Sequence, residues 1–211
     1  LVPIITAMGL ATSNIGLGAT YSTTYYSPFH VARLFASIDH FTKGRSAWNV
    51  VTSLNDSEAQ NFGVSEHLAH DARYDSADEF MSLVCKLWDS WEHGAMVVDK
   101  ESGQFADSTK VHRIDHLGPY FQSQGAFTVP HAPQGHPVII QAGQSERGRQ
   151  FAARWGELLF VIYPTADGCR AYRQNLRQQK AALGRDPDSV KVAPAVYVVV
   201  GETEEIAQEK L

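Results

Sequence analysis

The residues best placed to do chemistry follow short apolar runs that have the composition of buried strands. Four such segments are rich in hydroxyl, amide and arginine side chains, and they span residues 20–25, 49–55, 143–147 and 163–165. In parallel α/β proteins, ligands bind at the carboxyl ends of the strands. We therefore expect the functional site to be assembled from these segments.

The segment from Gln141 to Gly148 runs from an expected strand into an expected helix. Unpaired backbone N–H groups and the helix dipole attract an anion such as phosphate at that point, and the Ser145 hydroxyl would add a donor. Ser145 could equally act only as the helix N-cap. The G-x-S-x-G nucleophile elbow of hydrolases does not fit, because Arg147 occupies the position of its second glycine.

A polar connector, residues 65–75, contains His70 and Tyr74 four positions apart. In a helix these two side chains would share a face and could clamp a phosphate or a ribityl chain. A solvated charged connector is the alternative. A metal site is a weaker third interpretation, since its ligands would not all face one way on a helix; they would be Glu66, His67, His70 and Asp71.

Aromatic side chains also occur near these segments, namely Tyr25, Tyr26, Phe29 and Trp48. They could line a flat pocket that accepts a ring. Plain packing in the core is the simpler interpretation for large aromatics at such positions.

Strands and helices alternate along the chain. Apolar runs predict strands at residues 14–22, 46–52, 138–142, 158–163 and 190–200. Ser27 and Pro28 are typical of a helix start. The sequence Ser76-Ala-Asp-Glu79 fits a capping box for a helix that continues to Trp91, and further helices are expected at residues 146–155, at 167–183 and from Thr203. Residues 94–137 have no steady period and are interpreted as a loop-rich insertion.

Bulk properties exclude several classes of protein. The formal net charge is −5 and no Lys/Arg-rich run is present, so nucleic acid is not an expected partner. Cys85 and Cys169 lie in apparently helical stretches without metal-ligand spacing, so neither a disulfide nor a zinc site is expected. No apolar stretch has the length of a membrane span, and residues 1–10 lack the features of a signal peptide. A cytoplasmic location is therefore expected.

Five strands alternating with helices fit either an open doubly wound sheet or part of a barrel. The dinucleotide fingerprint G-x-G-x-x-G is absent, because Gly16 and Gly18 lie inside an expected strand and no third glycine follows. The chain of 211 residues is shorter than the roughly 250 residues that a closed α/β barrel usually needs. The pattern alone leaves both architectures open.

Four ordered motifs resemble one known family. They are GATYSTTYYSPFHVAR at residues 18–33, DHFTKGRSAWNVVTS at 39–53, HDARY at 70–74 and QAGQS at 141–145. Together they resemble the nitrilotriacetate, dibenzothiophene-sulfone and pristinamycin-synthase group of the bacterial-luciferase-like flavin-dependent monooxygenases. The resemblance spans essentially the whole chain.

This resemblance implies an α/β fold, a (β/α)8 TIM barrel of the luciferase-like type. Residues 1–211 would form a single domain truncated at both ends, an incomplete barrel of about five of the eight strands. The flavin-contacting residues of the family fall on Thr20, His70, Tyr74 and Ser145, and Asn49 is a further expected pocket residue. No catalytic residue is assigned.

The same resemblance implies a two-component monooxygenase. A separate NAD(P)H:flavin reductase would supply reduced FMN (FMNH2), and a C4a-peroxyflavin formed from FMNH2 and O2 would oxygenate a small organic substrate. A homodimer or higher homo-oligomer is implied as well. An F420-dependent oxidoreductase that transfers hydride is the nearest alternative, and a non-catalytic flavin-binding protein is another.

Overall fold

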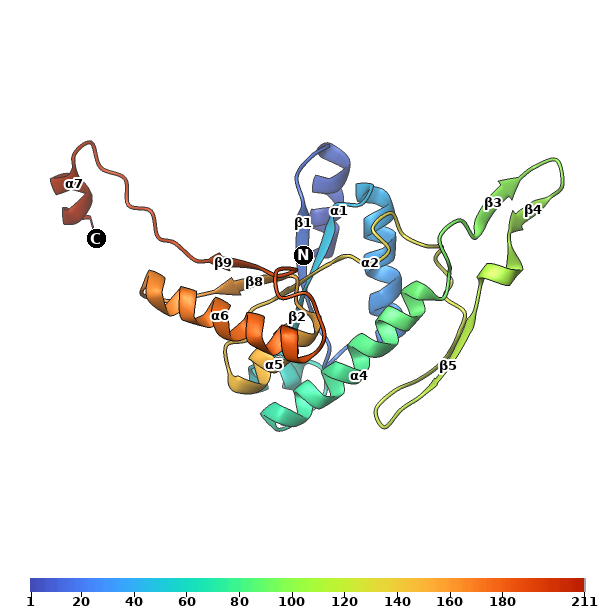
Figure 1. Cartoon of the computed structure of the whole chain (residues 1–211), viewed down its shortest axis with the longest axis horizontal. Helices are drawn as coiled ribbons and strands as arrows, with labels where there is room; N and C mark the ends of the chain where they lie inside the picture. The colour runs from blue at the N-terminus through green and yellow to red at the C-terminus, as the bar shows by residue number, and fades with distance from the viewer. Residues whose placement is uncertain (211) are drawn as a thin grey trace.

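A five-stranded parallel sheet forms the centre of the computed structural model, which describes residues 1–210. The strands are β1 (Leu17–Ser22), β2 (Ser46–Val51), β7 (Val138–Gln141), β8 (Leu158–Val161) and β9 (Lys191–Pro194). Each strand pairs in parallel with the next one of the sheet in chain order, β1-β2-β7-β8-β9 (Figure 1). A doubly wound sheet would reverse its strand order at a switch point, so the order favours a barrel section.

Five helices pack as one layer against this sheet, namely α1 (Val2–Ala11), α2 (Pro28–Thr42), α4 (His70–Asp89), α5 (Glu146–Trp155) and α6 (Ala166–Ala182). The short helix α3 (Asp56–Asn61) follows β2, and α7 (Glu204–Glu209) lies away from the sheet at the end of the extended C-terminal segment (Figure 1). Contacts run from α1 to α2, α4, α5 and α6 in turn. Trp48 and Val50 point into the helix layer and are buried, whereas Thr20 and Phe160 lie on the opposite, exposed face. A sheet covered by helices on one face is what a section of a (β/α)8 barrel has, so the predicted fold class is confirmed.

The core is built around Trp48, which is fully buried. Its ring stacks on Phe35 with centroids 5.3 Å apart and meets Trp88 edge-on at 6.5 Å. Phe29 packs edge-on against Phe127 in the same core. Trp48 and Phe29 therefore serve packing, and among the four aromatics considered above only Tyr25 and Tyr26 remain near the strand ends.

The start of α4 differs from the sequence prediction. The capping box at Ser76–Glu79 is wrong, because α4 begins at His70 and these residues lie inside the helix. Glu79 instead accepts hydrogen bonds from the backbone N–H groups of Tyr120 and Phe121, both at 2.9 Å. A tertiary contact thus uses the carboxylate that the local pattern assigned to a helix cap.

Residues 94–137 contain two antiparallel hairpins that the sequence pattern does not predict. One joins β3 (Met96–Asp99) to β4 (Gln104–Ala106), and the other joins β5 (Arg113–Leu117) to β6 (Gln122–Gly125), with the short 3-10 helix η1 (Ser108–Lys110) between them. Figure 1 shows β5 beside α4, whereas β3 and β4 project away from the body of the molecule. Segment 94–137 does not line the cavities at the strand ends that are described below.

The predicted strand at 190–200 is only partly correct. β9 ends at Pro194, and the N–H of Ala195 makes a 2.8 Å bond to Val161 O. Val196 to Val200 are extended and mostly exposed, Tyr197 by 99%. Apolar β-branched residues favour a strand, but a strand forms only where a neighbour pairs with it. The pattern also does not predict α1 or α3.

The two cysteines, Cys85 and Cys169, are free thiols. Within residues 1–210, no helix combines the length and the apolar character that crossing a membrane requires.

The buried carboxylate of Asp39 links α2, the start of β2 and the loop that contains Gln134. Asp39 is fully buried on α2, and its carboxylate accepts from Ser46 Oγ at 2.8 Å, from Gln134 N at 2.9 Å and from Gln134 Nε2 at 2.6 Å. Asp39→Asn would turn an amide N–H2 toward these donors. We expect it to lower the free energy of unfolding by about 2–4 kcal/mol, measured by urea denaturation. Asp115→Asn, at an exposed carboxylate, is the matched control; an equal loss in both variants would contradict this role.

Lys180 is a fully buried cation without a carboxylate in hydrogen-bonding contact. Its Nζ donates to Gly156 O at 3.0 Å and to Ser189 Oγ at 3.1 Å. Burial, followed by the charge of Arg185, lowers the pKa of Lys180 to about 8. The unfolded chain therefore binds the extra proton between about pH 8 and pH 10, so stability rises with pH across this window, by about 1–2 kcal/mol. Lys180→Met should remove that rise in thermal unfolding scans; a variant that keeps the parent's rise would show another group to be responsible.

Candidate functional site

The turn between β7 and α5 carries Ser145 as the N-cap of α5. Its Oγ accepts from Gly148 N at 3.0 Å, as capping requires. The hydroxyl proton is not used in that bond and can point to His70 Nε2 or to a ligand. Ser145 can therefore cap α5 and also contact an anion, so the two interpretations of this residue are compatible.

His70 and Tyr74 project from the first turns of α4 toward the same turn. Their rings lie 5.1 Å apart, so they do share one helix face. His70 Nε2 is 3.4 Å from Ser145 Oγ, and Asp71 Oδ1 lies 2.7 Å from His70 Nδ1. Asp71 thus orients the ring, and Nε2 is the nitrogen that faces Ser145.

Two glycines leave space beside the Tyr74 hydroxyl. A Cβ on Gly143 would lie 2.6 Å from Tyr74 Oη, and a Cβ on Gly148 would lie 2.9 Å from it. The Cβ on Gly148 would also come within 3.0 Å of Ser145 Oγ. Any larger residue at either position would displace the hydroxyls. We call the group formed by His70, Tyr74, Gly143, Ser145 and Gly148 the α5 cradle.

Arg147 has a supporting position outside the α5 cradle. Its guanidinium pairs with Asp78 at 2.5 Å and Asp75 at 2.9 Å, and it lies 5.6 Å from the centroid of the Tyr74 ring. These contacts tie α5 to α4 and hold Tyr74 in place. The cradle is therefore built from neutral donors and from the first turn of α5.

Thr20 and Asn49 form a second group on the exposed face of the sheet. They are direct neighbours in the β1–β2 register, and Asn49 Nδ2 donates to Thr20 Oγ1 at 3.0 Å. Asn49 Oδ1 is buried and has no hydrogen-bond partner among residues 1–210. A buried acceptor without a partner costs about 1–3 kcal/mol, so it is suited to a ligand that brings a donor.

A cavity of about 140 Å³ lies beside the α5 cradle, at the ends of β2 and β7. Its lining includes Tyr74 and Gly143 from the α5 cradle and Val50 to Leu54 from the end of β2. Of the five residues expected at the site, His70, Tyr74 and Ser145 are brought together directly. Thr20 and Asn49 lie together on the neighbouring strands.

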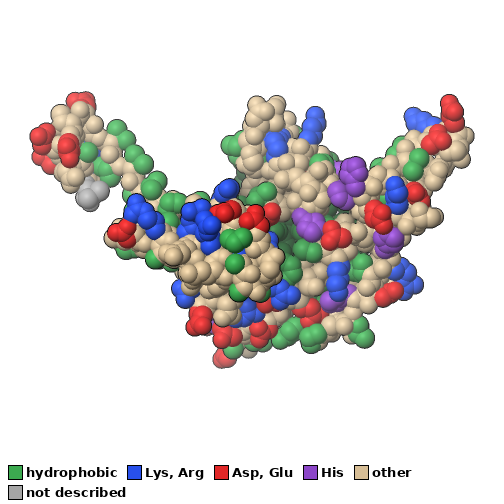
Figure 2. All heavy atoms as spheres, viewed as in Figure 1, with side chains coloured by type: hydrophobic (Ala, Val, Ile, Leu, Met, Phe, Trp, Pro, Cys, Tyr) green, Lys and Arg blue, Asp and Glu red, His purple; other side chains and the backbone are tan. Residues whose placement is uncertain are grey.

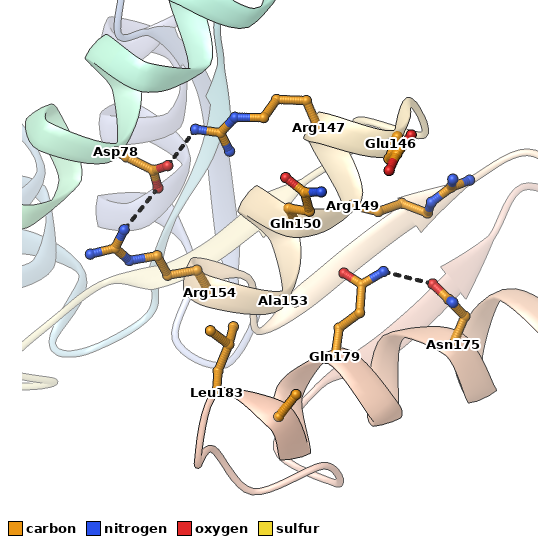
Figure 3. A pocket seen from close by; sticks show the side chains of 11 residues that line it. Asp78, Glu146, Arg147, Arg149, Gln150, Ala153, Arg154, Asn175, Gln179 and Leu183 are labelled. Carbon is orange, nitrogen blue, oxygen red and sulfur yellow. Dashed lines mark hydrogen bonds and ion pairs between the residues drawn. The ribbon is translucent and has the colours of Figure 1, made fainter.

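A larger cavity, about 670 Å³, lies elsewhere, between α5 and α6. Basic side chains gather over α6 on this surface (Figure 2). Figure 3 shows that Arg147 and Arg154 both turn to Asp78, at 2.5 and 3.8 Å, so their charge is largely balanced within the protein. Its volume alone would favour this cavity as the ligand site. The unpaired Asn49 Oδ1 and the α5 cradle instead favour a ligand site at the strand ends.

The proposed metal ligands do not gather at one point. Within residues 1–210, no group of three or more His, Cys, Asp and Glu side chains could hold a metal ion. His67 is engaged elsewhere, with its Nδ1 2.6 Å from the Tyr25 hydroxyl.

The sequence interpretation missed Gly148 and Glu58. The first keeps the α5 cradle open, and the second lines a cavity beside Thr20. A glycine inside the first turn of a helix is a usable signal, because glycine is unfavourable there unless space is needed. The sequence pattern does not indicate a role for Glu58, because this residue lies in a polar stretch for which no helix or strand is predicted.

Known proteins resemble this chain closely. The sequence profile of the family described as luciferase-like monooxygenase matches residues 2–211. Dibenzothiophene-sulfone monooxygenase of Rhodococcus erythropolis is 51% identical over 208 residues, which cover 99% of this chain and 46% of that protein. Nitrilotriacetate monooxygenase component A of Aminobacter aminovorans is 46% identical over 207 residues, covering 98% of this chain and 46% of that protein.

A solved structure of riboflavin lyase, with modified FMN and the substrate riboflavin, superposes with a TM-score of 0.94. It is 44% identical in sequence, and the match covers 99% of this chain and 47% of that chain. The chain thus spans about half the length of the relatives it matches.

Proposed function

The chain belongs to the luciferase-like monooxygenase family, and on this premise we propose that it carries the FMN site of a two-component monooxygenase. The observation that carries the proposal is the α5 cradle, in which Tyr74, His70 and Ser145 converge on a helix N-terminus kept open by two glycines. This arrangement suits a phosphate group, because N–H donors and the helix dipole face the anion.

The donor set of the α5 cradle fits the phosphate of FMN. Ser145 and Tyr74 offer hydroxyl donors and the first N–H groups of α5 complete the set, with His70 beside them. Hydrogen bonds to a charged acceptor contribute about 1.5–3 kcal/mol each. In this proposal, these groups hold the phosphate and fix the end of the ribityl chain.

Thr20 and Asn49 are proposed to hold the ring end of the flavin. The unpaired Asn49 Oδ1 can accept from an imide N–H, which the flavin ring carries, while Nδ2 stays bonded to Thr20. The cavity beside the α5 cradle lies at the end of β2, the strand that carries Asn49. Orienting the ring and excluding water from it are the tasks of the chain.

Reduced FMN, when bound, would supply the electrons that activate O2 for insertion into a small organic substrate. The proposal includes a separate NAD(P)H:flavin reductase as the source of FMNH2, a homodimer or higher homo-oligomer, and a cytoplasmic location. Two relatives are named for an aromatic sulfone and for an aminopolycarboxylate, so family membership alone does not select a substrate class.

The test is an anaerobic titration of reduced FMN, and separately of reduced F420, into the protein that carries this sequence, followed by admission of O2. We expect binding of FMN and O2 consumption that depends on the protein. Binding of F420 alone would favour the hydride-transferring alternative. Binding of FMN without any turnover over a substrate panel would favour a non-catalytic flavin-binding protein, and binding of neither would overturn the proposal.

A further inference from the structure

A second cavity at the strand ends has walls unlike those of the α5 cradle. It has a volume of about 370 Å³ and lies at the carboxyl ends of β1 and β2, closed on one side by the start of α1. Its lining includes Thr20, Tyr21, Ser22, Tyr26 and Glu58. Thr20 belongs also to the proposed ring end of the flavin, so the two sites adjoin.

Aromatic rings form one wall of this cavity. The rings of Tyr21 and Tyr26 lie 4.1 Å apart, and Phe62 meets Tyr26 edge-on at 5.4 Å. Tyr25 stacks face to face on Phe62 at 4.6 Å and its hydroxyl lies 2.6 Å from His67 Nδ1, which holds the loop after β2 against this wall. Rigid aromatic walls bind flat rings by stacking and edge contacts.

Glu58 is the only charged side chain among the described residues that line the cavity. Its Oε1 accepts from Ser53 Oγ at 2.8 Å, and Ser53 Oγ lies 2.8 Å from Ser22 Oγ. Ser22 Oγ in turn accepts from Thr24 N at 3.1 Å. Within residues 1–210, no lysine, arginine or histidine forms an ion pair with Glu58. Hydrogen-bond donors therefore fix the carboxylate, and no basic side chain of the described residues pairs with it.

The backbone at Ser53 supports this orientation of Glu58 by adopting an unfavourable conformation. Ser53 is buried and has φ = 61°, in the left-handed region that residues other than glycine rarely adopt. Such a conformation costs about 1–3 kcal/mol and is retained where the surroundings enforce it, often at functional sites. Here it directs the Ser53 hydroxyl to Glu58 on α3.

We propose that this cavity is the substrate pocket, and that Glu58 makes it select neutral or cationic flat aromatic compounds and reject carboxylates. The proposal rests on the proposed flavin site, because Thr20 is shared by both. The aromatic wall formed by Tyr21 and Tyr26 binds the ring, and a substrate N–H can donate to the free oxygen of Glu58. A negatively charged group would instead face an uncompensated carboxylate.

The test uses two probes of the same shape, 1-naphthamide and 1-naphthoate, with the protein that carries this sequence. In calorimetric titrations, we expect the parent to bind the amide at least about tenfold more tightly than the acid, because like charges this close repel strongly. Glu58→Gln keeps an acceptor for Ser53 and removes the charge, so the preference should shrink to within about threefold. Glu66→Gln, at an exposed carboxylate between α3 and α4, should keep the parent's preference.

A second variant covers the case in which Glu58→Gln fails to fold. Tyr26→Leu should weaken binding of both probes by a similar factor, because it removes ring contacts and leaves the charge. Equal binding of the two probes by the parent, an unchanged preference in folded Glu58→Gln, or an unchanged amide affinity in Tyr26→Leu would each overturn the inference. A parallel titration of reduced FMN separates the two proposals: a protein that binds FMN but not the amide contradicts the substrate pocket alone, and one that does not bind FMN contradicts the flavin site.

Discussion

Replacing Ser145 by Ala and Tyr74 by Phe together is expected to weaken binding of reduced FMN by about 100-fold or more. Each change removes one hydroxyl donor of the α5 cradle, and a hydrogen bond to a charged group contributes about 1.5–3 kcal/mol. Since about 1.4 kcal/mol corresponds to a tenfold change in affinity, the two losses give at least this factor. Anaerobic titration calorimetry measures it directly.

The matched control makes the same two chemical changes at exposed positions, Ser65→Ala with Tyr197→Phe. It should bind reduced FMN as the parent does. The Tyr74 ring stays in the test variant and keeps its edge contact with Phe151 at 5.5 Å, so the fold should survive. If the test variant binds reduced FMN as tightly as the parent, the α5 cradle is not the phosphate site.

Gly148→Ala is expected to lower the affinity for reduced FMN by at least about tenfold while leaving the fold stable. The added Cβ would lie 2.9 Å from Tyr74 Oη, 3.0 Å from Ser145 Oγ and 3.1 Å from the carbonyl carbon of Gly143. The hydroxyls must move out of the cradle to relieve this crowding. Alanine also favours a helix over glycine by up to about 1 kcal/mol, which offsets part of the strain in the free protein.

Flavin titration and thermal unfolding of the same Gly148→Ala sample separate the two effects. Gly16→Ala is the control, because a Cβ there would find its nearest neighbour, Arg45 O, only at 4.0 Å. The prediction is contradicted by unchanged flavin affinity. It is also contradicted by a fall in stability large enough to account for the lost binding.

Local chemistry explains which parts of the fold the sequence could predict. Ser27 and Pro28 define the start of α2 by themselves, and Ser27 Oγ accepts from His30 N as expected. The strands of the central sheet carry apolar side chains on the face that the helices bury, so their positions could be predicted from the sequence. Ser145 was found for the same reason, since capping is a local property of the turn.

Long-range contacts explain what the sequence could not predict. Glu79 fits a capping box, yet its partners Tyr120 and Phe121 lie about forty residues away. The strands of the hairpins in segment 94–137 have only three to five residues and are mostly exposed, so they give no clear apolar period. Gly148 and Glu58 matter through neighbours brought close only by folding, namely Tyr74 and Ser53.

The most direct test of the flavin site is a crystal structure of the protein that carries this sequence, grown with FMN. We expect phosphate density at the N-terminus of α5, within hydrogen-bonding distance of Ser145 Oγ and Tyr74 Oη, and the flavin ring beside Asn49. Phosphate density in the basic cavity between α5 and α6, near Arg149 and Arg154, would contradict it (Figure 3).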